Sequence, residues 1–128
     1  MKLEDIAKVY EQGIRFQLKP RKRKGLKGEY FRGINLYFTE YEDEVDYYKT
    51  VLHEFIHVIK PDYKEEQIED LAGLVLAADM GYLQHIIDLF DLPEWEEIKR
   101  LQEKYAEIKS EKTLKSKKNI TTTVLYCA

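Results

Sequence analysis

Apolar residues recur every three or four positions over several long segments of this chain, a pattern typical of amphipathic helices. The segments are residues 3 to about 18, 43–60, 64 to about 80, and 93 to about 110, and residues 82–90 add a short apolar helix or turn. Pro20 and Pro61 end the helices that precede them. The pattern predicts a largely helical protein.

Residues 28–41 break this helical pattern, because they are rich in β-branched and aromatic residues. Apolar and more polar residues alternate over 34–39, which predicts a strand with one buried and one half-polar face. Gly33 interrupts the segment and is expected at a tight turn or a bulge. We therefore expect an α+β fold, in which a small antiparallel sheet or hairpin packs on a bundle of helices.

Composition narrows the class of protein. The chain has 128 residues, 44% hydrophobic and 35% charged, which fits a single globular domain over residues 1–128. No apolar run is long enough to span a bilayer and no signal-peptide pattern is present, so no membrane association is expected. The single cysteine, Cys127, excludes an intramolecular disulfide and favours a cytoplasmic location.

Positive charge is concentrated in residues 19–27, where six Lys or Arg side chains surround Pro20 and Gly25. The composition predicts a loop. It is either a patch for nucleic acid or an acidic partner, or a solvated hinge; the hinge is favoured because no aromatic residue is interleaved. The net charge of −3 gives no wider argument for nucleic acid. A Lys-rich tail, residues 111–128, is expected to be flexible or to add its strand-prone end to a sheet edge.

The candidate chemistry lies in the helix over residues 43–60, which contains His53-Glu54-Phe55-Ile56-His57. Residues four apart share one face of a helix, so His53 and His57 can hold one metal ion between them. Glu54, one step round the helix, would accept a proton from the activated water. The alternative is a helix that carries two histidines and a solvated glutamate by chance. The chain has only three histidines, and two of them stand at the required spacing.

A catalytic zinc ion usually takes a third protein ligand. If the next helix returns antiparallel after Pro61, the rise of 1.5 Å per residue brings its first acidic residues level with the histidines. The candidates are Glu65, Glu66, Glu69 and Asp70. Glu69 is preferred because it precedes small residues on an inward face, and Glu66 is second. His85 is a weaker candidate, expected in the core.

The two motifs together, His53 to His57 and then Glu69-Asp70-Leu71-Ala72, resemble the zinc-peptidase core of the ImmA/IrrE-type metallopeptidases. The resemblance covers roughly residues 28–80. It implies His53, His57 and Glu69 as zinc ligands and Glu54 as the general base. Ile56 departs from the family, which usually has a small residue there, and the interval from His57 to Glu69 is short. SprT-like and other minimal zinc peptidases remain open.

The sequence thus predicts a zinc-dependent metallopeptidase acting on a peptide or protein substrate, with a regulatory role allowed by the resemblance. The strand over residues 34–39 would offer its edge to the substrate. Tyr63, Tyr82 and His85 are the candidates for stabilising the oxyanion. The alternative is an inactive zincin-like module that binds nucleic acid or a partner protein, and a purely structural metal is a third possibility.

Overall fold

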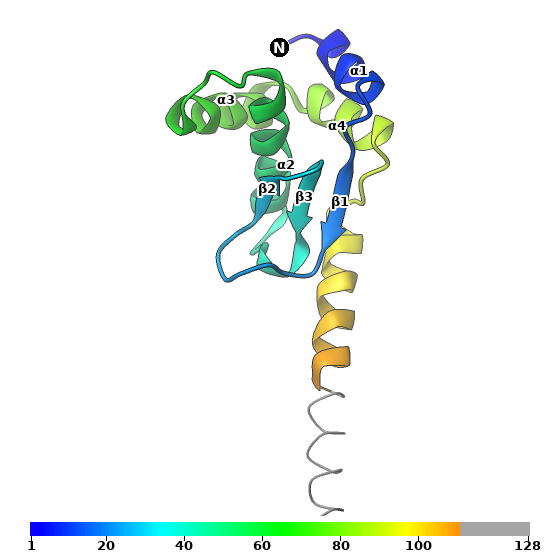
Figure 1. The fold of residues 1–128 in the computed structure, drawn as a ribbon. Helices are drawn as coiled ribbons and strands as arrows, with labels where there is room; N and C mark the ends of the chain where they lie inside the picture. Colours follow the sequence, from blue (N-terminus) through cyan, green and yellow to red (C-terminus); the bar gives the residue numbers. More distant parts are fainter. Residues whose placement is uncertain (111–128) are drawn as a thin grey trace, which may run out of the picture.

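Five helices and one three-stranded sheet make up residues 1–110, the part of the chain described by the computed structural model (Figure 1). The fold is α+β, as predicted. In chain order the elements are α1 (Leu3–Glu11), β1 (Phe16–Lys19), β2 (Gly28–Tyr30), β3 (Ile34–Tyr37), a 3-10 turn η1 (Phe38–Glu40), α2 (Glu44–Ile59), α3 (Glu65–Ala78), α4 (Met80–Leu89) and a C-terminal helix over 95–110. Both predictions for the tail, residues 111–128, lie outside the described residues.

The sheet has the strand order β1-β3-β2, with β1 parallel and β2 antiparallel to β3. The predicted hairpin is therefore present as β2 and β3. Its turn places Arg32 and Gly33 at positive φ, 55° and 118°, and Gly33 adopts this conformation without the steric cost that a Cβ brings. The carbonyl of Gly33 accepts a hydrogen bond of 2.9 Å from the Phe31 N–H.

The central position of β3 corrects two predictions. All four of its residues are buried, including Asn35 at 1% exposure and Tyr37 at 3%, so the expected half-polar face is not exposed. Because β3 is paired on both sides, it also has no free edge to offer a substrate. The free edge on the hairpin side belongs to β2.

The first predicted helix is shorter than expected. It ends at Glu11, and Gly13 follows with φ of 83°. Phe16 belongs to β1, where hydrophobic spacing had placed it at the end of a helix. Its ring packs edge-on against Phe90, with 5.2 Å between centroids. The Ile34 N–H donates to the Arg15 carbonyl, which ties this segment to the sheet.

Helix α2 is the central element of the core, with the sheet on one side and α3 and α1 on others. Its buried residues include Tyr47, Leu52 and Phe55. The C-terminal helix is joined to this core through hydrogen bonds from Gln102 to the carbonyls of Phe38 and Tyr41, at 2.7 and 2.9 Å. Among residues 1–110, no helix combines the length and the apolar character that crossing a bilayer requires.

The direction of α3 matters for the site. Helix α2 ends at Ile59, just before Pro61, and α3 begins at Glu65 after a short turn. Figure 1 shows α3 at a steep angle to α2, near the C-terminal end of α2. The first turn of α3 meets the last turns of α2 through Glu65, and the next turn reaches His53 and Lys49 through Glu69.

Candidate metal centre

Helix α2 carries the three residues of the predicted motif on one side of the molecule. The N-terminus of this helix is capped, because the Asp43 side chain accepts a hydrogen bond from the Asp46 N–H at 2.8 Å. Its other face is anchored in the core, which fixes the rotation of the helix about its axis. His53 and His57 lie one turn apart, and their Nε2 atoms are 3.1 Å from each other. The two imidazoles therefore point toward one place, as the spacing predicted.

Glu65, the first residue of α3, supplies a carboxylate at this place. One oxygen lies 2.8 Å from His57 Nε2 and the other 3.0 Å from His53 Nε2. The ligand atoms of these three residues all lie within 4.8 Å of one another. Two imidazole nitrogens and one carboxylate, with no thiolate, form the donor set of an open catalytic zinc site and not of a closed structural one. The residues present therefore fit a zinc ion.

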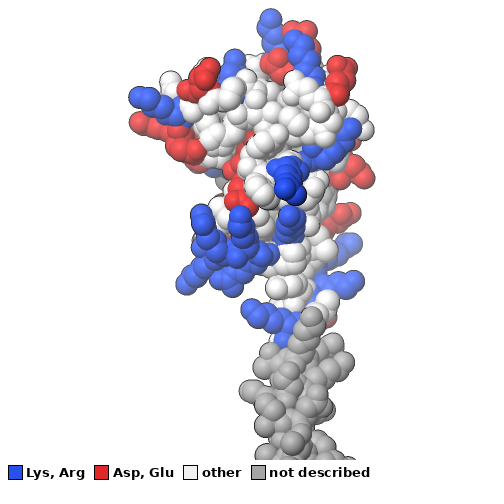
Figure 2. All heavy atoms as spheres, viewed as in Figure 1, with Lys and Arg blue, Asp and Glu red and all other residues white. Residues whose placement is uncertain are grey.

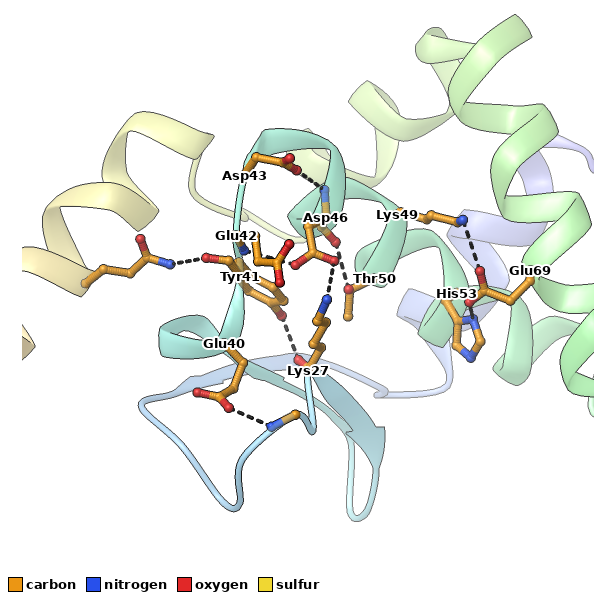
Figure 3. Close-up of polar contacts among 12 residues, drawn as sticks. Lys27, Glu40, Tyr41, Glu42, Asp43, Asp46, Lys49, Thr50, His53 and Glu69 are labelled. Atoms are coloured by element: carbon orange, nitrogen blue, oxygen red, sulfur yellow. Dashed lines mark hydrogen bonds and ion pairs between the residues drawn. The ribbon is translucent and has the colours of Figure 1, made fainter.

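Glu69, the residue predicted as third ligand, lies on the other side of His53. Its Oε1 is 2.7 Å from His53 Nδ1, and its Oε2 is 3.1 Å from Lys49 Nζ (Figure 3). Apart from this contact, Nδ1 is buried without a hydrogen-bond partner. Burial raises the pKa of Glu69, but the hydrogen bond from Lys49 and the charge of His53 outweigh it and lower the pKa overall. An ionised Glu69 behind Nδ1 favours the tautomer that leaves Nε2 free to bind a metal.

The remaining acidic candidates do not join this cluster. Glu66 and Asp70 are exposed on α3 and belong to no metal-binding group among residues 1–110. His85 is exposed on α4, where we had expected a core residue. Of the oxyanion candidates, Tyr82 is buried in the core near Phe55. Neither Tyr82 nor Tyr63 lines the clefts beside the histidines.

Glu54 is the buried acid of the site, with only 8% of its surface exposed. Burial raises its pKa from 4.5 to about 7; the charge of His53 acts in the opposite direction, while Glu65 and Glu29 add to the rise. A carboxyl with a pKa near neutrality is suited to accept and return a proton. This holds for the metal-free protein, since a nearby cation favours the ionised form.

Gly28, at the start of β2, allows the sheet to lie directly against Glu54. A Cβ at this position would stand 3.0 Å from Glu54 Cγ, 3.0 Å from Thr50 Cγ2 and 3.2 Å from the Asn35 carbonyl oxygen. Such distances require the neighbours to move. Sequence reasoning did not single out Gly28, because a glycine at the start of a strand gives no sign of what packs on it. The same contact helps to exclude water from Glu54.

Two clefts meet at the motif and together form a groove. The larger, of about 770 Å³, has an apolar part made by Ile14, Tyr30, Val58 and Pro61. The smaller, of about 310 Å³, is polar, with Lys27, Lys49 and Thr50 in its lining. Both clefts are lined by Gly28, His53 and Glu54. The groove passes the candidate metal site and runs along the free edge of β2.

No family model, curated protein or solved structure matches this chain. The resemblance to ImmA/IrrE-type metallopeptidases accordingly stays a prediction.

Proposed function

We propose that this protein is a zinc-dependent metallopeptidase that hydrolyses a peptide or protein substrate. The observation that carries the proposal is the convergence of His53 Nε2, His57 Nε2 and the Glu65 carboxylate beside the buried Glu54. Three ligands of this kind leave a coordination position open for water. We assign the third ligand to Glu65 in place of Glu69, and we assign to Glu69 the role of orienting His53.

His53, His57 and Glu65 would hold the zinc ion, which would supply an activated water near neutral pH and polarise the scissile carbonyl. Glu54 accepts the proton of the attacking water and then donates it to the leaving amine. Its burial under Gly28 keeps bulk solvent from competing for that proton. The Lys49 and Glu69 pair holds the ring of His53 in the orientation that its ligand role requires.

The substrate would lie extended in the groove. Strand β2 (Gly28–Tyr30) is an edge strand that lines the larger cleft, so its free N–H and C=O groups can pair with a peptide main chain by β-augmentation. The apolar part of that cleft suits a large apolar side chain next to the scissile bond. The strand proposed to pair with the substrate is therefore β2, and not β3 as we expected from the sequence.

The proposal includes membership of the ImmA/IrrE type, a regulatory role and a cytoplasmic location. The motif His53-Glu54-x-x-His57 supports the first; with Glu65 as third ligand, the Glu69-x-x-Ala72 pattern of the resemblance supplies a positioning residue and not a ligand. An inactive module that binds a partner protein or nucleic acid is the second candidate, and the exposed basic loop over residues 19–27 favours it.

The test is metal analysis of the purified protein, followed by proteolysis of an unfolded protein substrate. We expect one zinc ion per chain, lost in His53→Ala, and metal-dependent cleavage that Glu54→Gln abolishes while zinc is retained. Glu65→Gln should weaken zinc binding at least tenfold, whereas the matched variant Glu66→Gln, one residue further along the same helix turn, should not change it. A zinc-free protein, or equal cleavage by Glu54→Gln, would refute the proposal.

A further inference from the structure

The basic loop, residues 19–27, carries more positive charge than its surroundings neutralise. Figure 2 shows Lys and Arg gathered on the loop between β1 and β2. Three of its six cations have carboxylate partners: Lys22 with Glu29 at 2.7 Å, Lys27 with Asp46 at 2.8 Å, and Arg21 with Glu40 at 3.8 Å. Within residues 1–110, Lys19, Arg23 and Lys24 form no ion pair. The charges of Arg23 and Lys24 act on Glu29 and Glu40 without direct contact, so these three side chains still have room for an anionic partner.

The loop is held in place at three points, although its residues 19–25 are exposed. The Pro20 carbonyl accepts the Thr39 N–H at 3.2 Å. The Gly25 N–H donates to Glu40 Oε1 at 2.8 Å, and the Lys27 carbonyl accepts the Tyr41 hydroxyl at 2.9 Å (Figure 3). The loop thus presents its charges from a defined position, so less entropy is lost when a partner binds.

The loop also forms one end of the groove at the candidate metal site. Gly25 and Lys27 line the polar cleft together with His53 and Glu54. Lys27 and Lys49 inside that cleft are already paired with Asp46 and Glu69. A chain that leaves the site through the polar cleft therefore reaches the loop at Gly25, which directly follows Arg23 and Lys24 in the sequence.

We propose that the basic loop binds an acidic segment of polypeptide that flanks the bond presented to Glu54. This polypeptide is a substrate only if the protein has the proposed peptidase function. The binding surface itself does not depend on that function. Continuity with the groove favours a polypeptide over nucleic acid.

The first test is binding, measured by fluorescence anisotropy on the zinc-loaded full chain carrying Glu54→Gln. The probes are a labelled peptide of alternating Glu and Ala, its Gln and Ala counterpart, and a short DNA duplex. We expect the acidic peptide to bind about tenfold more tightly than the neutral one, and less tightly as salt is added. Arg23→Glu with Lys24→Glu should remove this preference, and Arg23→Gln with Lys24→Gln should reduce it.

The matched control reverses two exposed cations on the C-terminal helix, Arg100→Glu with Lys104→Glu, which changes the net charge equally and should keep the preference. Equal loss in this control would overturn the proposal, because it would show a general charge effect. A duplex that binds more tightly than the acidic peptide and depends on Arg23 and Lys24 would also overturn it, in favour of nucleic acid.

The second test separates this proposal from the peptidase proposal. The wild-type zinc protein is given two peptides with the same apolar core, one with a Glu-rich flank and one with a Gln-rich flank. We expect kcat/KM to be about tenfold higher for the acidic flank and equal for both in Arg23→Glu with Lys24→Glu. Cleavage of both peptides at equal rates overturns the loop proposal and leaves the peptidase. Peptide binding that depends on the loop but is not followed by cleavage would support the loop proposal and refute the peptidase proposal.

Discussion

Burial of an ionisable acid beneath a strand has a measurable cost, and Glu54 allows it to be determined. Its pKa is raised from 4.5 to about 7, chiefly by burial. The folded protein therefore holds a proton that the unfolded chain releases between these two values. By linkage, the contribution of Glu54 to the free energy of unfolding is greatest below pH 4.5, and it falls as the pH rises toward about 7.

The size of the effect follows from the same two values. Each pH unit between them corresponds to about 1.4 kcal/mol, so the metal-free protein should lose roughly 3 kcal/mol of unfolding free energy to Glu54 ionisation. The Glu54→Gln variant keeps the shape and has no proton to lose. It should match the wild type near about pH 4 and exceed it by roughly 3 kcal/mol near about pH 8.

Urea unfolding in the presence of a chelator, followed by circular dichroism across this pH range, measures the difference. Comparing the two proteins cancels the other titrating groups, such as Glu69, whose lowered pKa acts in the opposite direction. Glu66→Gln, an exposed change on α3, should leave the pH profile as in the wild type. A constant difference between Glu54→Gln and wild type at every pH would refute the reasoning. With zinc bound the difference should shrink, because the cation favours the ionised acid.

Three further predictions follow from single contacts. Glu69→Gln should weaken zinc binding by about ten- to a hundredfold in a chelator competition, because His53 loses the charged partner at Nδ1; an unchanged affinity would exclude an orienting role. Gly28→Ala should lower kcat more than zinc content, since its Cβ would meet Glu54 at 3.0 Å, and full activity would contradict the close packing. Phe55→Ala, a fully buried ring in α2, should cost about 3–5 kcal/mol in thermal or urea unfolding; a loss below about 1 kcal/mol would contradict its place in the core.

The local chemistry of the site could be predicted from the sequence, because its parts depend on short spacings. Two histidines four residues apart must share a helix face, and the hairpin follows from its residue types and Gly33. The extra strand β1 was hidden, since Phe16 continues the apolar spacing of α1 closely enough to be read as helix. Gly13, with its positive φ, was the signal that the helix ends earlier.

The glutamate that lies beside both histidines, which we propose as the third ligand, could not be chosen from the sequence, because its position depends on the angle between two helices. Counting residues along an antiparallel return selects Glu69. In the structure α3 crosses α2 at an angle, so that Glu65 lies at the Nε2 atoms of both histidines, while Glu69 lies at His53 Nδ1 and at Lys49. Both glutamates are about half exposed or more, at 70% for Glu65 and 48% for Glu69, so burial does not distinguish them either. Only the path of the turn after Pro61 determines which of the two glutamates reaches the Nε2 atoms of the histidines.

Glu65 stands at the first residue of α3, and this has a consequence for the folded chain itself. The first turn of a helix lacks part of its own hydrogen bonding and frays readily. An ion held by His57 and Glu65 would act as a cross-link that closes the corner over residues 57–65. Metal binding and formation of the first turn of α3 would then be coupled in a single equilibrium. Amide exchange in that corner would report how full the site is, without any substrate.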